Sequence, residues 1–182
     1  VRNDADAKLQ AGDRPQAQAQ TKYEKQIEEN RKRIIGETKG LMSTYEKNGE
    51  LTSSQKSKLV DNLKWLDGNY DKWAFFNTDD DIYKDAKKMV NEGLFSGKAY
   101  YIKKVRGLMK EYENGNQSIS PKEMHNYLRK IDRSYEPSIA SSTPIGAYND
   151  AKAMESAGLF KINDGVIAQN GTVVKIDNQD QI

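Results

Sequence analysis

Hydrophobic positions in the first third of the chain repeat at helical spacing. Between Thr21 and Lys47 the apolar residues fall at steps of three, four and seven, which is the stripe of an amphipathic helix. The stripe consists of Tyr23, Ile27, Ile34, Ile35, Leu41, Met42 and Tyr45. The pattern predicts one long helix. Residues 1–20 are rich in Gln, Ala, Asp and Arg and have almost nothing to bury, so we expect a disordered or frayed tail there.

Capping residues predict two further helices in the first half of the chain. Thr52 is placed to cap a helix that runs through Leu66, since its hydroxyl can accept a backbone N–H of the first turn. Thr78 can cap a third helix, whose first turn carries three aspartates beside the positive end of the helix dipole. Gly93 fits the left-handed position that ends such a helix, because a side chain would disfavour that conformation.

The chain repeats itself. Residues 83–95 read "YKDAKKMVNEGLF" and residues 148–160 read "YNDAKAMESAGLF". Residues 40–52, "GLMSTYEKNGELT", are matched with one insertion by residues 107–120, "GLMKEYENGNQSIS". The second copy keeps the same helix stop, with Met154, Gly158 and Leu159 in place of Met89, Gly93 and Leu94. The sequence therefore predicts a mostly α fold made by tandem duplication of a three-helix unit (helix, turn, helix, loop, short helix).

After the second copy, the helical pattern of apolar residues gives way to β-rich runs. Asn170-Gly171 lies between β-rich runs, and this dipeptide is the strongest short signal for a β-hairpin. The predicted organisation is a tail at 1–20, a first helical unit at 21–96, a second at 97–161, and a C-terminal β-hairpin and tail at 162–182.

Charge and composition narrow the function classes. Lys and Arg number 29 and Asp and Glu 27, so the net charge of +2 gives no reason to expect nucleic acid or an anionic membrane as the partner. Two basic clusters, at 31–33 and 103–106, are interleaved with Glu and are interpreted as solvated faces. No apolar run is long enough to span a bilayer. The chain begins at Val1 instead of Met, which suggests a processed mature protein or a trimmed chain, and we expect an extracytoplasmic location, periplasmic or secreted.

Candidates for catalysis are weak. The absence of cysteine excludes disulfides, thiolate metal sites and cysteine nucleophiles. His125 is the single histidine and is interpreted as a helix-surface residue, with no serine elbow nearby. Carboxylate pairs for acid–base chemistry can be assembled from Asp67, Asp71, Asp79, Asp80, Asp81 and Glu92. We expect no cofactor, and a small carboxylate-dependent hydrolase is the third interpretation of the chain.

The turns between the first two helices of each unit resemble EF-hand loops. The second turn offers Asn114, Asn116 and Glu123 at ligand-like spacing. Calcium loops need a carboxylate at position one and a sharp turn at position six, and Tyr112 and Gln117 stand there instead. We therefore expect helix caps and no metal site.

The two units differ most at the end of their second helix and in the loop that follows it. The first unit holds Trp65, Tyr70, Asp71, Trp73, Phe75 and Phe76 there, and the second keeps only Tyr135 of the aromatic residues. Large rings in a loop form either a satellite core or a recognition surface. We interpret the segment as the binding site of a non-enzymatic module whose partner is another protein, such as an exported inhibitor, immunity or assembly protein. The alternative is a cell-wall or glycan-binding module that stacks these rings on sugars.

Overall fold

The computed structural model describes residues 4–162, 165–167 and 173–174, and side chains from residue 22 to residue 162. The described chain is mostly helical, as predicted. Its helices are α1 (Asp4–Asn48), α2 (Ser53–Leu66), α3 (Asp79–Asn91), α4 (Lys98–Glu113), α5 (Pro121–Ile131) and α6 (Pro144–Ser156). Three short 3₁₀ helices connect them: η1 (Ala74–Phe76), η2 (Leu94–Ser96) and η3 (Ile139–Ser142).

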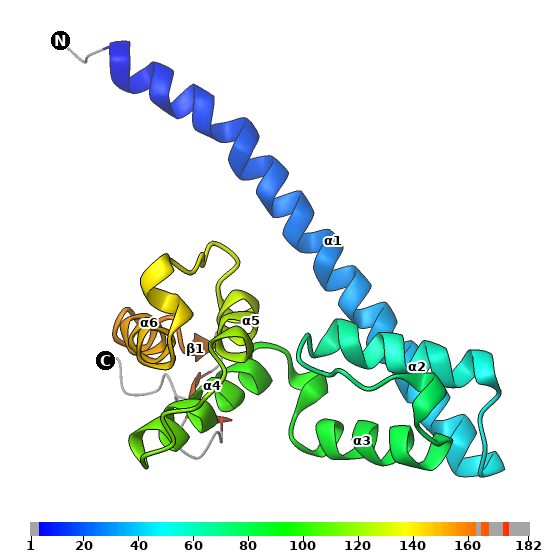
Figure 1. The fold of residues 1–182 in the computed structure, drawn as a ribbon. Coiled ribbons are helices and arrows are strands. Elements are labelled where there is room, and N and C mark those ends of the chain that lie inside the picture. The colour runs from blue at the N-terminus through cyan, green and yellow to red at the C-terminus, as the bar shows by residue number, and fades with distance from the viewer. Residues whose placement is uncertain (1–3, 163–164, 168–172, 175–182) are drawn as a thin grey trace.

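Helix α1 is longer than the hydrophobic stripe predicted. It begins at Asp4 and so includes residues 4–20, for which a disordered or frayed tail was expected. Ala, Gln, Lys and Arg are good helix formers and favour the helix here without an apolar face, whereas Gly12 and Pro15 within the same segment oppose it. In Figure 1 the N-terminal half of α1 projects away from the other helices.

The predicted caps are confirmed at the starts of the middle helices. The Thr52 hydroxyl accepts the Gln55 N–H at 3.1 Å, and the Gln55 side chain accepts the Thr52 N–H in return. Thr78 and Asp81 form the same reciprocal box at the start of α3. Ser120 and Glu123 have the residue types and spacing that predict a third reciprocal box, and this prediction is confirmed in part: Ser120 accepts the Glu123 N–H at 3.2 Å, but the Glu123 side chain makes no reciprocal bond.

Left-handed glycines end α3 and α6. Gly93 has φ of 102° and Gly158 has φ of 80°. After α6, the N–H of Leu159 reaches the carbonyl of Met154 at 3.1 Å, which completes a Schellman arrangement. After α3, the N–H of Gly93 donates to the carbonyl of Val90 at 2.9 Å, and the chain continues directly into η2.

The helices pack in two groups that share one core. Helices α1, α2 and α3 pack together, and α4, α5 and α6 form the other group (Figure 1). The buried apolar side chains of both groups belong to a single cluster, with Leu59, Leu63, Ile102 and Leu128 fully buried within it. Among the described residues, no helix has the length and apolar character required to cross a bilayer.

The last described residues form a small antiparallel sheet of order β1-β2-β3. Its strands are β1 (Lys161–Ile162), β2 (Gly165–Ile167) and β3 (Val173–Val174). Val166 pairs with Lys161 on one side and with Val174 on the other. The predicted turn at Asn170-Gly171 lies outside the described residues, so the hairpin stays a prediction.

Candidate functional site

The aromatic segment between α2 and α3 is attached at its base by one buried carboxylate. Asp67 is only 5% exposed and ends α2. Its Oδ2 atom accepts hydrogen bonds from the hydroxyls of Tyr100 at 2.6 Å and Tyr127 at 3.1 Å. Its Oδ1 atom accepts the N–H of Asn69 at 3.0 Å. Helices α2, α4 and α5 therefore meet at this carboxylate.

Asn69 connects the same loop to α5. Its side-chain Nδ2 donates to the carbonyl of Glu123 at 3.2 Å, and its Oδ1 accepts from Asn126 at 2.8 Å. On the other side of the loop, the Tyr70 hydroxyl donates to Asp85 of α3 at 2.9 Å, and Lys72 lies 2.7 Å from the same carboxylate. Desolvation and the bond to Asp85 raise the pKa of Tyr70. The base of the loop is thus fixed to helices on both sides.

The tip of the loop, in contrast to its base, exposes large aromatic side chains to solvent. Trp73 is 65% exposed, Phe75 88% and Phe76 78%. The rings of Phe75 and Phe76 meet edge to face with centroids 5.1 Å apart, and the Lys64 ammonium lies 4.7 Å from the centre of the Trp73 ring. The Asn77 side chain donates to the Trp73 carbonyl at 2.8 Å, which holds the short helix η1. We call Trp73, Phe75 and Phe76 the aromatic tip.

The six residues predicted as a binding site therefore separate into two sets. Trp65 and Tyr70 are half-buried and pack against the core, as the satellite-core interpretation predicted for the whole segment. Trp73, Phe75 and Phe76 are exposed, as the recognition-surface interpretation required. Asp71 is also exposed and lies at the rim of a pocket beside the base of the loop.

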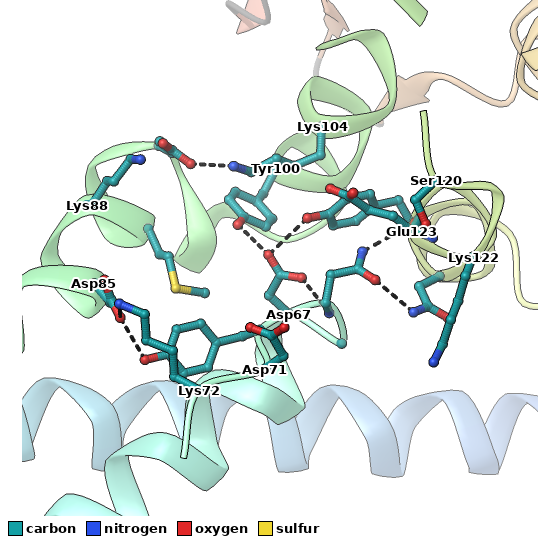
Figure 2. A pocket seen from close by; sticks show the side chains of 17 residues that line it. Asp67, Asp71, Lys72, Asp85, Lys88, Tyr100, Lys104, Ser120, Lys122 and Glu123 are labelled. Carbon is teal, nitrogen blue, oxygen red and sulfur yellow. Dashed lines mark hydrogen bonds and ion pairs between the residues drawn. The ribbon is translucent and has the colours of Figure 1, made fainter. Parts of the chain in front are cut away.

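That pocket has a volume of about 530 Å³ and lies between the two groups of helices (Figure 2). Its wall contains Asp67, Asp71, Asp85, Glu92 and Glu123 together with Lys72, Lys88 and Lys104. Most of these carboxylates already have partners. Asp67 and Asp85 accept tyrosine hydroxyls, and Glu92 forms an ion pair with Lys104 at 2.5 Å.

Glu123 lines the same pocket and is half-buried in it. Desolvation, followed by the nearby charges of Asp67 and Glu111, raises its pKa. A raised carboxyl pKa suits a general acid, but the same environment is expected for a carboxyl group in a polar junction between helices. Among residues with described side chains, no group of three or more acidic or histidine residues has the geometry of a metal site.

Several residues in the candidate list occupy structural positions. His125 is half-buried, and its Nε2 lies 2.8 Å from the carbonyl of Ser141, so the helix-surface interpretation was incomplete. Arg31 was interpreted as part of a solvated face, but its guanidinium donates to the Tyr101 hydroxyl at 3.0 Å and to the Leu94 carbonyl at 2.9 Å. Asp79 and Asp80 at the start of α3 accept from the Leu51 N–H and the Tyr45 hydroxyl.

Sequence reasoning missed the residues that hold the base of the loop. Tyr100, Tyr127 and Asn126 come from α4 and α5, 33 to 60 positions away from their partners. The tyrosines occupy apolar positions of amphipathic helices, where they are indistinguishable from ordinary core residues. The one local sign of this hydrogen-bonded base in the sequence was a polar residue at the start of the loop, Asp67, directly before Gly68.

No protein-family model, curated protein or solved structure matches this chain in the comparisons made.

Proposed function

We propose that this chain is a non-enzymatic protein-binding module, and that the aromatic tip inserts into an apolar recess of a partner protein. The observation that carries the proposal is the exposure of Trp73, Phe75 and Phe76, at 65%, 88% and 78%, on a loop whose base is fixed. Large aromatic side chains dominate the energy of protein interfaces. A fixed base also supports binding, because little conformational freedom is lost on association.

A duplicated fold supports this assignment, and we propose that residues 40–95 and 107–160 are two copies of one helical unit. Equivalent contacts recur in both. The rings of Tyr45 and Tyr83 stack with centroids 4.5 Å apart, and those of Tyr112 and Tyr148 stack at 4.6 Å. The bond from Tyr70 to Asp85 has a counterpart from Tyr135 to Asp150, with the same separation of 15 positions.

The second copy then acts as an internal comparison for the aromatic tip. Ser138, Ala140 and Ser141 stand 65 positions after Trp73, Phe75 and Phe76, and the second loop still forms a short helix, η3. A unit of this kind therefore folds without the three aromatic rings. Their presence in the first unit is better explained by a contact outside the chain than by a requirement of folding.

Photo-crosslinking in the native host tests the proposal. A photoreactive phenylalanine analogue at position 75 should give a discrete crosslinked species with a partner protein. The matched control places the same analogue at Ile139, which is 94% exposed on η3. Equal crosslinking patterns at the two positions, or no crosslinked protein at position 75, would contradict the assignment.

A glycan-binding module is the second proposal. It has less support than the protein-binding proposal, because the ring faces of the aromatic tip are partly occupied. Sugars stack on open ring faces beside polar groups, whereas one face of Trp73 is covered by the Lys64 ammonium at 4.7 Å and Phe75 contacts Phe76. Titration with cell-wall oligosaccharides separates the two. A saturable change in tryptophan fluorescence would favour glycan, and no change would favour protein.

A carboxylate-dependent hydrolase remains the third proposal, with Glu123 in the pocket as its acid. Loss of a measured hydrolytic activity in Glu123→Gln would support it. The exported location, as for an inhibitor, immunity or assembly protein, is tested by locating the protein in fractionated host cells.

A further inference from the structure

A second concave surface lies beside the aromatic tip and is strongly basic. It is a groove of about 960 Å³ between α1, the end of α2, the start of α4 and the end of α5. Six cationic side chains line it: Arg31, Lys64, Lys98, Arg129, Lys130 and Arg133. Glu28 is the one acidic residue among the side chains that form its walls. We call this surface the basic groove.

The cations of the basic groove are not neutralised within the part of the chain whose side chains are described. The ion pairs found there involve other lysines and arginines, and among the side chains of residues 22–162 no carboxylate lies within 4.0 Å of any of the six. The chain as a whole carries a net charge of only +2, so this concentration of positive charge is local. A concave surface of one sign focuses its field and attracts ligands of the opposite sign.

Aromatic rings hold several of these cations in place. Lys130 lies 5.1 Å from the centre of the Trp65 ring, Arg31 lies 5.8 Å from that of Tyr101, and Arg133 lies 6.0 Å from that of Tyr23. Lys130 also donates to the Trp65 carbonyl at 3.3 Å. The cations are therefore partly ordered before any ligand arrives, which reduces the entropy lost on binding.

The neighbouring rings and cations change the pKa of Lys130. Its side chain is exposed, but its ammonium group lies over the rings of Trp65 and Tyr101, 5.1 and 5.9 Å from their centres, and these rings reduce its contact with water. This desolvation, together with the positive charges of Arg31 and Arg133, lowers the pKa of Lys130. An anion in the groove would relieve the repulsion among the three groups.

The ring faces argue against nucleic acid as the anion. Proteins that bind single strands stack bases on open aromatic faces. Trp65, Tyr101 and Tyr23 each carry a cation over a face, so a stacked base would compete with these contacts. A groove of this volume also exceeds the space required by a single phosphate ion and suits several carboxylate side chains along one segment.

The basic groove is continuous with the aromatic tip through one residue. Lys64 lines the groove and also lies over the Trp73 ring at 4.7 Å. We infer that the basic groove receives an acidic segment of the same partner protein that covers the aromatic tip, an inference that rests on the proposed function. The partner would then present an apolar recess beside a run of Asp or Glu residues.

The test measures binding of a fluorescein-labelled poly-glutamate peptide to the full chain by anisotropy at low ionic strength. The Arg129→Gln/Arg133→Gln double variant should weaken binding by about tenfold, because both side chains are exposed groove cations. The control double variant, Lys47→Gln/Lys103→Gln, removes the same charge from exposed positions outside the groove and should change affinity by less than about twofold.

Other outcomes would overturn the inference. Equal weakening in both double variants would mean that the peptide responds only to net charge. Tighter binding of an oligothymidylate or of inorganic pyrophosphate than of the peptide would assign the groove to nucleic acid or to a small phosphate.

The acidic-segment inference and the proposed function of the aromatic tip can be contradicted independently. The variant Phe75→Ser/Phe76→Ser should leave peptide binding unchanged, because the tip is not part of the groove wall. If the groove double variant binds the peptide like the unmodified chain, the acidic-segment inference is wrong, whereas tip-dependent crosslinking in the native host would still support the proposed function.

Discussion

The hydroxyl of Tyr100 donates a 2.6 Å hydrogen bond to the carboxylate of Asp67, 33 positions earlier in the chain, and both side chains are buried. Figure 2 shows the two side chains meeting between the helix groups. Because Asp67 also receives the hydroxyl of Tyr127, one carboxylate joins the base of the aromatic loop to both α4 and α5. This bond explains how a loop with an exposed apolar tip keeps a fixed position.

Removing that carboxylate should destabilise the whole chain. Asp67→Ala leaves the Tyr100 and Tyr127 hydroxyls without their acceptor, and we expect a loss of about 2–4 kcal/mol in the free energy of unfolding. Urea denaturation followed by circular dichroism measures it. Asp71→Ala is the matched control, since Asp71 is exposed, and it should change stability by less than about 0.5 kcal/mol. Equal effects of the two variants would contradict the role of Asp67.

The two left-handed glycines should respond alike to alanine. Gly93→Ala and Gly158→Ala each place a Cβ on a backbone with positive φ, where the new Cβ meets no atom closer than 3.8 Å. The cost is thus conformational, about 1 kcal/mol or somewhat more at each site. Gly36→Ala, in the interior of α1 with open space around it, should instead stabilise by about 0.5–1 kcal/mol. Unchanged melting temperatures at positions 93 and 158 would show that the helix ends differ in solution.

Gly146 should be far less tolerant than either of these glycines. A Cβ at this position would lie 1.8 Å from the carbonyl oxygen of Ala140, which is backbone and has little freedom to move. Gly146→Ala should therefore lower stability by more than Gly158→Ala, about 3 kcal/mol or more, by separating η3 from α6. Thermal denaturation of both variants, side by side, measures the difference, and a smaller effect at position 146 would refute the close approach.

Whether a contact could be predicted from the sequence depends on how far apart its two residues lie in the chain. The caps at Thr52, Thr78 and Ser120 and the stop at Gly93 were predictable, because each involves a backbone group within five residues. The bond between Asp67 and Tyr100 was not, because a tyrosine in an apolar stripe carries no mark of its distant partner. The basic groove was missed for the same reason, since its cations come from four separate helices and from the loop after α5.

Alkaline pH should weaken the fold through the stacked tyrosines. Hydrogen bonds to Glu46 and Glu113 raise the pKa values of Tyr83 and Tyr148 to about 12, against 10.0 for an unperturbed tyrosine. A raised pKa in the folded chain means that stability is fully present below pH 10 and is lost as the pH rises towards 12.

Replacement by phenylalanine separates this effect from general alkaline denaturation. Tyr83→Phe and Tyr148→Phe keep the stacked rings, with their 4.5 and 4.6 Å centroid distances, and remove the ionisable group. Each variant should lose less stability than the unmodified chain over that pH range. A spectrophotometric titration in which no tyrosine ionises later than an unperturbed one would contradict the assignment.

The aromatic tip should matter for binding and not for folding. Phe75→Ser/Phe76→Ser removes two rings that are 88% and 78% exposed, so the melting temperature should stay nearly unchanged. Ile139→Ser provides the control, because it removes an equally exposed apolar side chain from the short helix η3 of the second group.

The role of the aromatic tip is tested most directly by the affinity of these two variants for the purified partner identified by crosslinking at position 75, with thermal stability measured in parallel. We expect Phe75→Ser/Phe76→Ser to weaken binding by at least about 2 kcal/mol at unchanged stability, while Ile139→Ser binds like the unmodified chain. Unfolding of the double variant, or binding unaffected by it, would contradict the claim that the aromatic tip is the docking surface.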